Sequence, residues 1–101
     1  MKFGGMNMQA MMRQAQKLQE QMAKAQEELE NAELVGSAGS GLVNVTLSGK
    51  KQLLKVELKP QIVDPDDIEM LEDLIVAAYN DAFEKASELE AQKMPNTGGL
   101  F

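Results

Sequence analysis

The 101-residue sequence predicts an α+β fold: a long N-terminal helix, a small antiparallel β-hairpin or three-stranded sheet, and a C-terminal helix. Three observations predict it. They are an apolar stripe at helical spacing over residues 8–32, a strand-like alternation over residues 42–58, and a helix-start signal at residues 64–67. The length is typical of one domain, which we place at residues 1–94, and we expect residues 95–101 to be a disordered tail.

The first predicted helix is defined by uncharged, mostly apolar residues at alternating steps of three and four. Its members, called the apolar seam below, are Met8, Met11, Ala15, Leu18, Met22, Ala25, Leu29 and Ala32. This is the heptad spacing of a helix that packs along another helix. We therefore predict a helix over residues 7–33, about 40 Å long at 1.5 Å per residue, whose seam needs a partner. The end of the last helix and a second copy of the chain are the expected partners.

The predicted sheet follows a glycine- and serine-rich stretch at residues 36–41, which we expect to be a flexible connection. Residues 42–47 alternate between apolar and polar, residues 48–50 form a turn, and residues 54–58 repeat the alternation until Pro60 ends the strand. Leu34 and Val35 are candidates for a short preceding strand. The residues on the apolar face of the hairpin are Val43, Val45, Leu47, Leu54, Val56 and Leu58.

The second predicted helix starts with Asp64 as its N-cap and Pro65 at its first position, and it ends near Lys93. The centre of its apolar face is formed by Leu71, Leu74 and Ile75. The apolar face of a small sheet must be covered by a helix or by a second copy of the chain. Sharing the core across a two-fold axis is the economical solution, so we expect these residues to form the core or a dimer interface.

Composition excludes several kinds of site. There is no Cys and no His, so disulfides, thiolate metal sites and histidine-based catalysis are excluded. The glycine stretch lacks the Gly-Lys-Ser/Thr ending of a P-loop, and residues 64–69 lack the central glycine of a calcium loop. The early methionines are potential Cu(I) ligands, but packing explains them better. We predict a cytoplasmic protein that is not an enzyme, with no cofactor, no metal, no small-molecule substrate and no membrane contact.

Charge is unevenly distributed along this acidic chain, whose net charge is −6. Residues 1–24 and residues 48–63 each carry a net charge of +3, whereas residues 64–101 carry −8. Two basic segments in an acidic chain are either ordinary solvated faces or binding surfaces for a polyanion.

Three sequence blocks, in order and over nearly the whole length, resemble the YbaB/EbfC family of bacterial nucleoid-associated DNA-binding proteins. The first block is FGGM at residues 3–6 with QAQKLQEQM at residues 14–22. The second is AGSGLV at residues 38–43, and the third is EMLEDLI at residues 69–75 with AAYNDA at residues 77–82.

This resemblance implies an intertwined homodimer shaped like tweezers, with sheets joined centrally and helical arms that bind duplex DNA with little sequence preference. It maps the DNA face onto Arg13, Lys17 and Lys24, with Lys85 and Lys93 on the second helix. The positive charge of residues 48–63, and not the resemblance, leads us to add Lys50 and Lys51 to the predicted DNA-binding residues. Contacts would then go to the DNA backbone, with effects on nucleoid organisation and gene expression. The alternative is a coiled-coil adaptor or holdase-like module that does not bind DNA.

Overall fold

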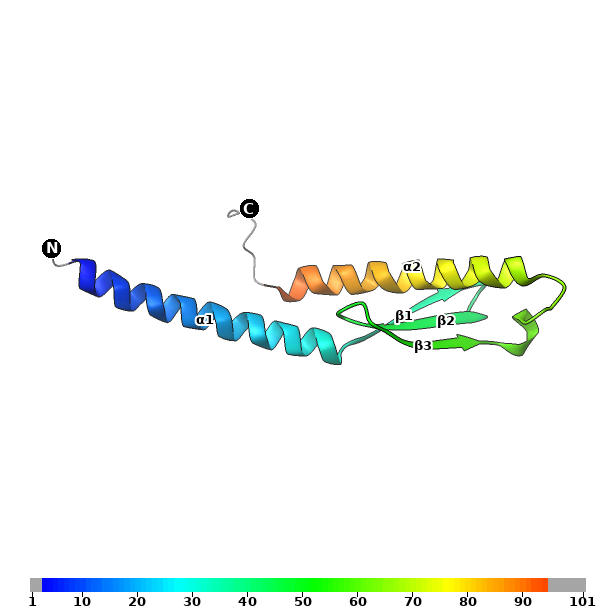
Figure 1. Ribbon diagram of the computed structural model, residues 1–101, viewed down its shortest axis with the longest axis horizontal. Helices are drawn as coiled ribbons and strands as arrows, with labels where there is room; N and C mark the ends of the chain where they lie inside the picture. The colour runs from blue at the N-terminus through cyan, green and yellow to red at the C-terminus, as the bar shows by residue number, and fades with distance from the viewer. Residues whose placement is uncertain (1–2, 95–101) are drawn as a thin grey trace.

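The chain folds into two helices and one sheet in the computed structural model, which describes residues 3–94. The elements are α1 (Phe3–Asn31), β1 (Glu33–Ala38), β2 (Val43–Ser48), β3 (Leu53–Leu58), the short 3-10 helix η1 (Pro60–Ile62) and α2 (Ile68–Lys93). The molecule is elongated, measuring 78 × 23 × 16 Å, with α2 over the sheet and α1 extending away from it (Figure 1). The predicted α+β class is confirmed. The predicted tail, residues 95–101, lies outside the described residues.

The sheet has three antiparallel strands in the order β1-β2-β3. The prediction of a flexible connection at residues 36–41 is therefore wrong for residues 36–38, which pair with residues 43–45 as the second half of β1. The physical reason lies at Gly36. A Cβ there would lie 2.2 Å from the carbonyl oxygen of Ala78 and 2.2 Å from the backbone nitrogen of Ala82. Glycine stands in this strand because β1 and α2 approach too closely for any side chain.

Helix α1 begins at Phe3 and ends at Asn31 instead of spanning the predicted residues 7–33, and α2 differs from the prediction at its start. Helix α1 ends at Asn31 because Glu33 already pairs with Ser48 as the first residue of β1. Helix α2 is capped by Asp67, whose side chain accepts a hydrogen bond from the backbone nitrogen of Met70 at 3.2 Å. Asp64 instead accepts from the backbone nitrogen of Asp66 in the preceding turn. The assignments of Asp64 as the N-cap and of Pro65 as the first helical residue were therefore wrong, since the helix begins at Ile68. The predicted end of this helix at Lys93 is confirmed.

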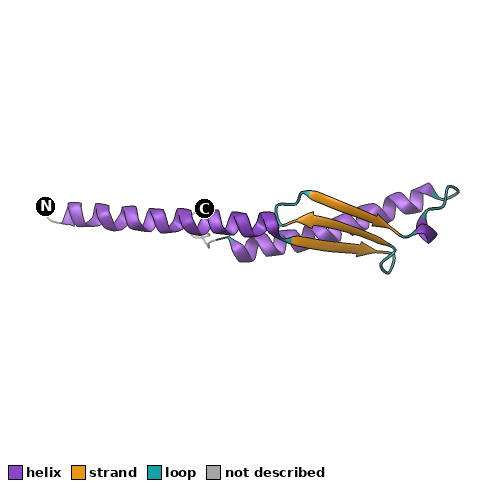
Figure 2. Cartoon of the chain, turned by 90° about the horizontal axis from the view of Figure 1, so that it is seen from below, coloured by secondary structure: helices purple, strands orange, loops and turns teal. Residues whose placement is uncertain are grey.

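Helix α2 crosses one face of the sheet (Figure 2). The core lies between this helix and the first two strands, β1 and β2. Val43, Val45 and Leu47 are fully buried there against Ala78 and Ala82. The predicted core residues of α2 are partly buried and pack against this cluster; they are Leu71, Leu74 and Ile75. The small alanines let the helix lie close to the sheet.

Strand β3 stands outside this core, and every one of its residues is exposed. The three predicted core or interface residues on it are Leu54 at 50% exposure, Val56 at 42% and Leu58 at 38%. They do not belong to the core of the single chain, because α2 packs against β1 and β2 and leaves β3 uncovered.

Candidate nucleic-acid interface

The N-terminal part of α1 projects beyond the rest of the molecule (Figures 1 and 2). Every residue from 7 to 24 is exposed, and the first buried residues of the helix are Ala25 and Leu29. Leu29 lies against the turn between β2 and β3, where a Cβ on Gly49 would be 2.5 Å from its carbonyl oxygen. The helix is therefore anchored at its C-terminal end, and residues 7–24, called the arm below, extend from this anchor. Gln21 and Lys24, at the base of the arm, lie beside the end of α2.

The arm carries three predicted DNA-binding residues on one side. Arg13, Lys17 and Lys24 are separated by four and seven residues, which places them within about 40° of one another around an α-helix. All three are exposed, and none forms an ion pair within the described chain. We call Arg13, Lys17 and Lys24 the basic stripe.

The same side of the arm carries further residues, of which the sequence analysis counted Glu20 only in the net charge of residues 1–24 and did not consider Gln9 and Gln16. Glu20 lies between Lys17 and Lys24 at helical spacing, so it opposes the positive charge of the stripe. Gln9 and Gln16 lie beside Arg13, and their amides are hydrogen-bond donors of the kind that contact phosphate oxygens. The helical spacing that predicted the seam also identifies them.

The two predicted lysines of the β2–β3 turn are engaged within the chain. The Lys50 Nζ atom donates a hydrogen bond to the side-chain oxygen of Gln26 on α1. The Lys51 Nζ atom lies 3.1 Å from Glu90 Oε1 and 5.1 Å from the centre of the Phe83 ring. These contacts join the turn to both helices, which is a structural role for this basic segment.

The two predicted lysines of α2 are also paired. The Lys85 Nζ atom lies 3.4 Å from Asp81 Oδ2 and donates to the backbone oxygen of Val35 at 2.8 Å. Asp81 also accepts from the backbone nitrogen of Ser37 at 3.0 Å, and this hydrogen bond is the main reason why the pKa of Asp81 lies below its ordinary value of 3.8. The pair Asp81–Lys85 therefore ties β1 to α2.

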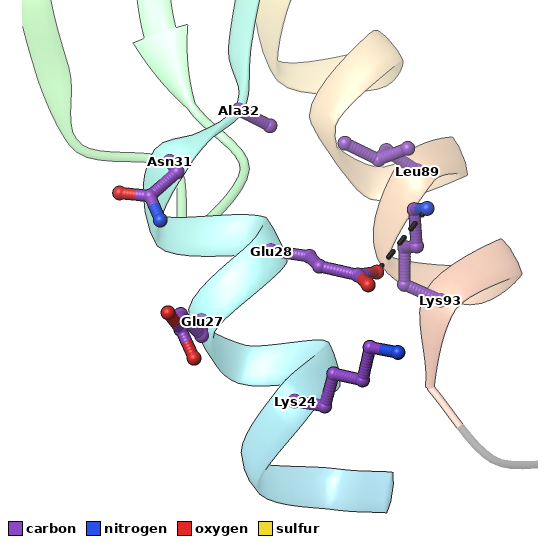
Figure 3. A pocket seen from close by; sticks show the side chains of 7 residues that line it. All are labelled: Lys24, Glu27, Glu28, Asn31, Ala32, Leu89 and Lys93. Carbon is purple, nitrogen blue, oxygen red and sulfur yellow. Dashed lines mark ion pairs between the residues drawn. The ribbon is translucent and has the colours of Figure 1, made fainter.

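Lys93 closes one side of a groove between the ends of the two helices (Figure 3). Its Nζ atom lies 3.2 Å from Glu28 Oε2, and Lys24 and Glu27 line the same groove. Two lysines and two glutamates leave the groove without a net charge that would attract a polyanion. Within residues 3–94, the basic side chains outside ion pairs are Arg13, Lys17 and Lys24 of the arm, together with Lys50, which binds the neutral Gln26, and Lys59. Lys24 is the member of the arm that shares the groove with Glu27 and Glu28.

Membrane-spanning helices and metal clusters are not found in the described part of the chain. Within residues 3–94, no helix is long and apolar enough to span a membrane. In the same residues, no group of three or more His, Cys, Asp or Glu side chains is placed to hold a metal ion.

Comparison with known proteins decides the family. A model of the YbaB/EbfC DNA-binding family matches residues 3–100. The chain belongs to this family. Its members are DNA-binding proteins and not enzymes, which confirms the family and the non-enzymatic role expected from the sequence.

Individual relatives agree with this membership. The chain is 54% identical to a nucleoid-associated protein of Clostridium novyi over 96% of this chain and 86% of the relative. It is 55% identical to a nucleoid-associated protein of Agathobacter rectalis over 96% of this chain and 88% of that relative. An uncharacterized protein of Helicobacter pylori has the same fold, with a TM-score of 0.72 at 16% identity over 81% of this chain and 86% of that structure.

Proposed function

We propose that this YbaB/EbfC protein is a cytoplasmic, nucleoid-associated protein that binds duplex DNA as a homodimer, through backbone contacts made by its arms. The observation that carries this proposal is the basic stripe, whose three cations lie exposed on one side of a projecting helix. The names of its relatives as nucleoid-associated proteins support the cellular location. Effects on nucleoid organisation and gene expression would follow from coating the duplex.

The chemistry of the stripe favours contacts to phosphates over the reading of base edges. Arginine and lysine neutralise phosphates without regard to sequence and release counterions as they do so. The two arms of a dimer would supply six cations. If each neutralises one phosphate, a plot of the logarithm of the binding constant against the logarithm of the salt concentration should have a slope of about −5. Between 50 and 200 mM salt this amounts to a decrease of about a thousandfold in affinity.

The homodimer is supported by apolar surface that the single chain leaves open. Val56 lies opposite Val45 in the sheet, so its side chain is on the face that α2 covers over β1 and β2. On α2, Val76 is 58% exposed and Phe83 is 39% exposed, and the Phe83 ring lies 5.1 Å from the Nζ atom of Lys51, in the turn that leads into β3. An apolar strip on a sheet edge and a neighbouring helix is typical of an interface. A second copy related by a two-fold axis would cover both.

The dimer is tested by replacing Val56 with Glu. In the single chain this residue is half exposed, so the variant should fold, but in a dimer the new carboxylate would be buried without a partner. Light scattering at micromolar concentration should report a dimer for the parent chain and a monomer for Val56→Glu. The control is Lys55→Glu on the opposite face of the same strand, which should remain dimeric. A monomeric parent chain would overturn the proposed dimer.

DNA binding is tested by a mobility-shift titration of a short duplex over a salt series. Arg13→Glu and Lys17→Glu should each weaken binding and reduce the salt slope by about one unit for each phosphate that the variant no longer neutralises. The matched control is Lys59→Glu, which makes the same charge change at an exposed position far from the arm. Equal decreases in affinity for all three variants would refute the assignment to the stripe. The absence of a shift by the parent chain at low salt would favour the adaptor function.

A further inference from the structure

The arm has a second face, opposite the basic stripe. At about 100° per residue, Met8, Met11, Ala15, Leu18 and Met22 of the apolar seam lie on the side of the helix that points away from Arg13 and Lys17. DNA that lies on the basic stripe therefore leaves this part of the seam uncovered.

The seam is filled at one end only. Ala25 and Leu29 are 5% and 1% exposed, whereas Met11 is 66% exposed, Leu18 38% and Met22 39%. The covering elements are the β2–β3 turn and the last turns of α2, which ends at Lys93 beside Glu28. The open part of the seam therefore continues a packed interface. Helix α2 ends before it could cover this open part.

The spacing of the open part suits a helix with the same seam. It holds two residues per heptad, which is the width of contact between two helices in a coiled coil. In an antiparallel pair of arms, Ala15 of each copy can lie opposite Leu18 of the other, and Met11 can lie opposite Met22. A small side chain then faces a large one, and flexible thioethers fill the remaining space.

We propose that the arm binds the arm of a second dimer through residues 8–22 of the seam, in an antiparallel coiled coil. This inference rests on the proposed DNA-binding function. A pair of arms joined through their seams would carry two basic stripes, one on each outer side of the pair, and each stripe would bind a duplex. Two DNA-bound dimers would then hold two duplex segments together. Each added contact would act at the high effective concentration that the DNA provides.

The test compares two double variants that introduce the same new side chain. Met11→Gln with Met22→Gln removes the two methionines that face each other in the pair. Ala10→Gln with Ala23→Gln places glutamines at the adjacent positions, which are exposed and outside the seam. All four changes keep the charge, and glutamine is a good helix former, so both proteins should fold as the parent does.

Two measurements are made on each protein. Sedimentation without DNA, over a concentration series, should show self-association of dimers by the parent chain and by the alanine-site variant. The methionine-site variant should require at least tenfold more protein to associate. The second assay measures bridging: beads carry one duplex, and a labelled second duplex is added with the protein. The parent chain and the alanine-site variant should retain the labelled duplex on the beads, and the methionine-site variant should retain at least tenfold less of it.

The outcomes separate this inference from the proposed function. A short duplex with room for one dimer reports DNA binding alone, and the methionine-site variant should bind it within twofold of the parent. If both variants associate and bridge as the parent does, or if the parent sediments as one species at every concentration, arm pairing is overturned. A parent that associates through the seam but does not bind the short duplex overturns the proposed function instead.

Discussion

Replacing Gly36 with Ala tests the close contact between β1 and α2. The new Cβ would lie 2.2 Å from two backbone atoms of α2 and 2.8 Å from the Cα atom of Ala82. Backbone cannot rotate away as a side chain can, so the strand and the helix must separate over the most buried part of the core. Overpacking of a core costs about 1–3 kcal/mol, and we expect a destabilisation near the upper end, about 3 kcal/mol. For a domain of this size, that lowers the Tm by about 12–24 °C.

The assay is thermal denaturation followed by circular dichroism at a fixed protein concentration, because the stability of a dimer depends on concentration. Gly41→Ala is the control. Its φ of +88° disfavours a side chain, but no atom lies within 4 Å of its Cβ position, so the expected cost is only the backbone strain of about 1–2 kcal/mol. A Gly36→Ala protein whose Tm falls by less than about 2 °C would refute the argument, since the close contact would then not constrain the fold.

Three further predictions follow from single contacts. Glu20→Gln removes the carboxylate from the basic stripe and should tighten DNA binding about two- to tenfold at 0.1 M salt in a mobility-shift titration; weaker binding would contradict the stripe. Asp81→Asn should lower the Tm at pH 7. Because the pKa of Asp81 is depressed in the folded chain, its stabilisation is present above 3.8 and is lost as the pH falls through the folded pKa. The Tm difference from the parent should therefore vanish in strongly acidic buffer, and a difference independent of pH would exclude this role. Gly49→Ala places a Cβ 2.9 Å from the Leu29 Cα atom and should speed amide exchange in the last turns of α1, by loosening the anchor of the arm; unchanged exchange would argue against that anchor.

Periodicity in the sequence was sufficient to predict the main elements. The three- and four-residue spacing of the seam predicts α1, and the alternation of Val43, Val45 and Leu47 predicts the central strand and its buried face. Both patterns are local, because each element faces the core with residues at a fixed interval. The α+β class follows from the order of these elements.

The parts that were missed depend on tertiary contacts. Gly36 is typical of a loop in isolation, but it pairs with Val45 in β1, and the close approach of α2 explains why a strand residue is glycine there. Three aspartates at residues 64–67 are all plausible caps in the sequence, and in the structure it is Asp67 whose side chain accepts from the Met70 nitrogen. The same holds for Lys51, which looks as available as Lys17 in the sequence until the fold places Glu90 beside it. The Asp81–Lys85 pair differs, because its residues are four apart on one helix and the spacing alone indicates it.

The distribution of charge in the fold explains how a chain with a net charge of −6 can bind a polyanion. The arm forms one end of a molecule 78 Å long, whereas the acidic start of α2 lies at the opposite end (Figure 1). At 0.1 M salt the Debye length is about 10 Å, so exposed acids at the far end do not weaken the field at the arm. In residues 48–63, Lys51 is paired with Glu90 and Lys55 lies 3.6 Å from Glu57, which leaves Lys50 and Lys59 as the basic side chains without a carboxylate partner. Because the acidic residues of α2 would repel DNA that approached them, we expect the duplex to contact the basic stripe, with the apolar seam facing away from it.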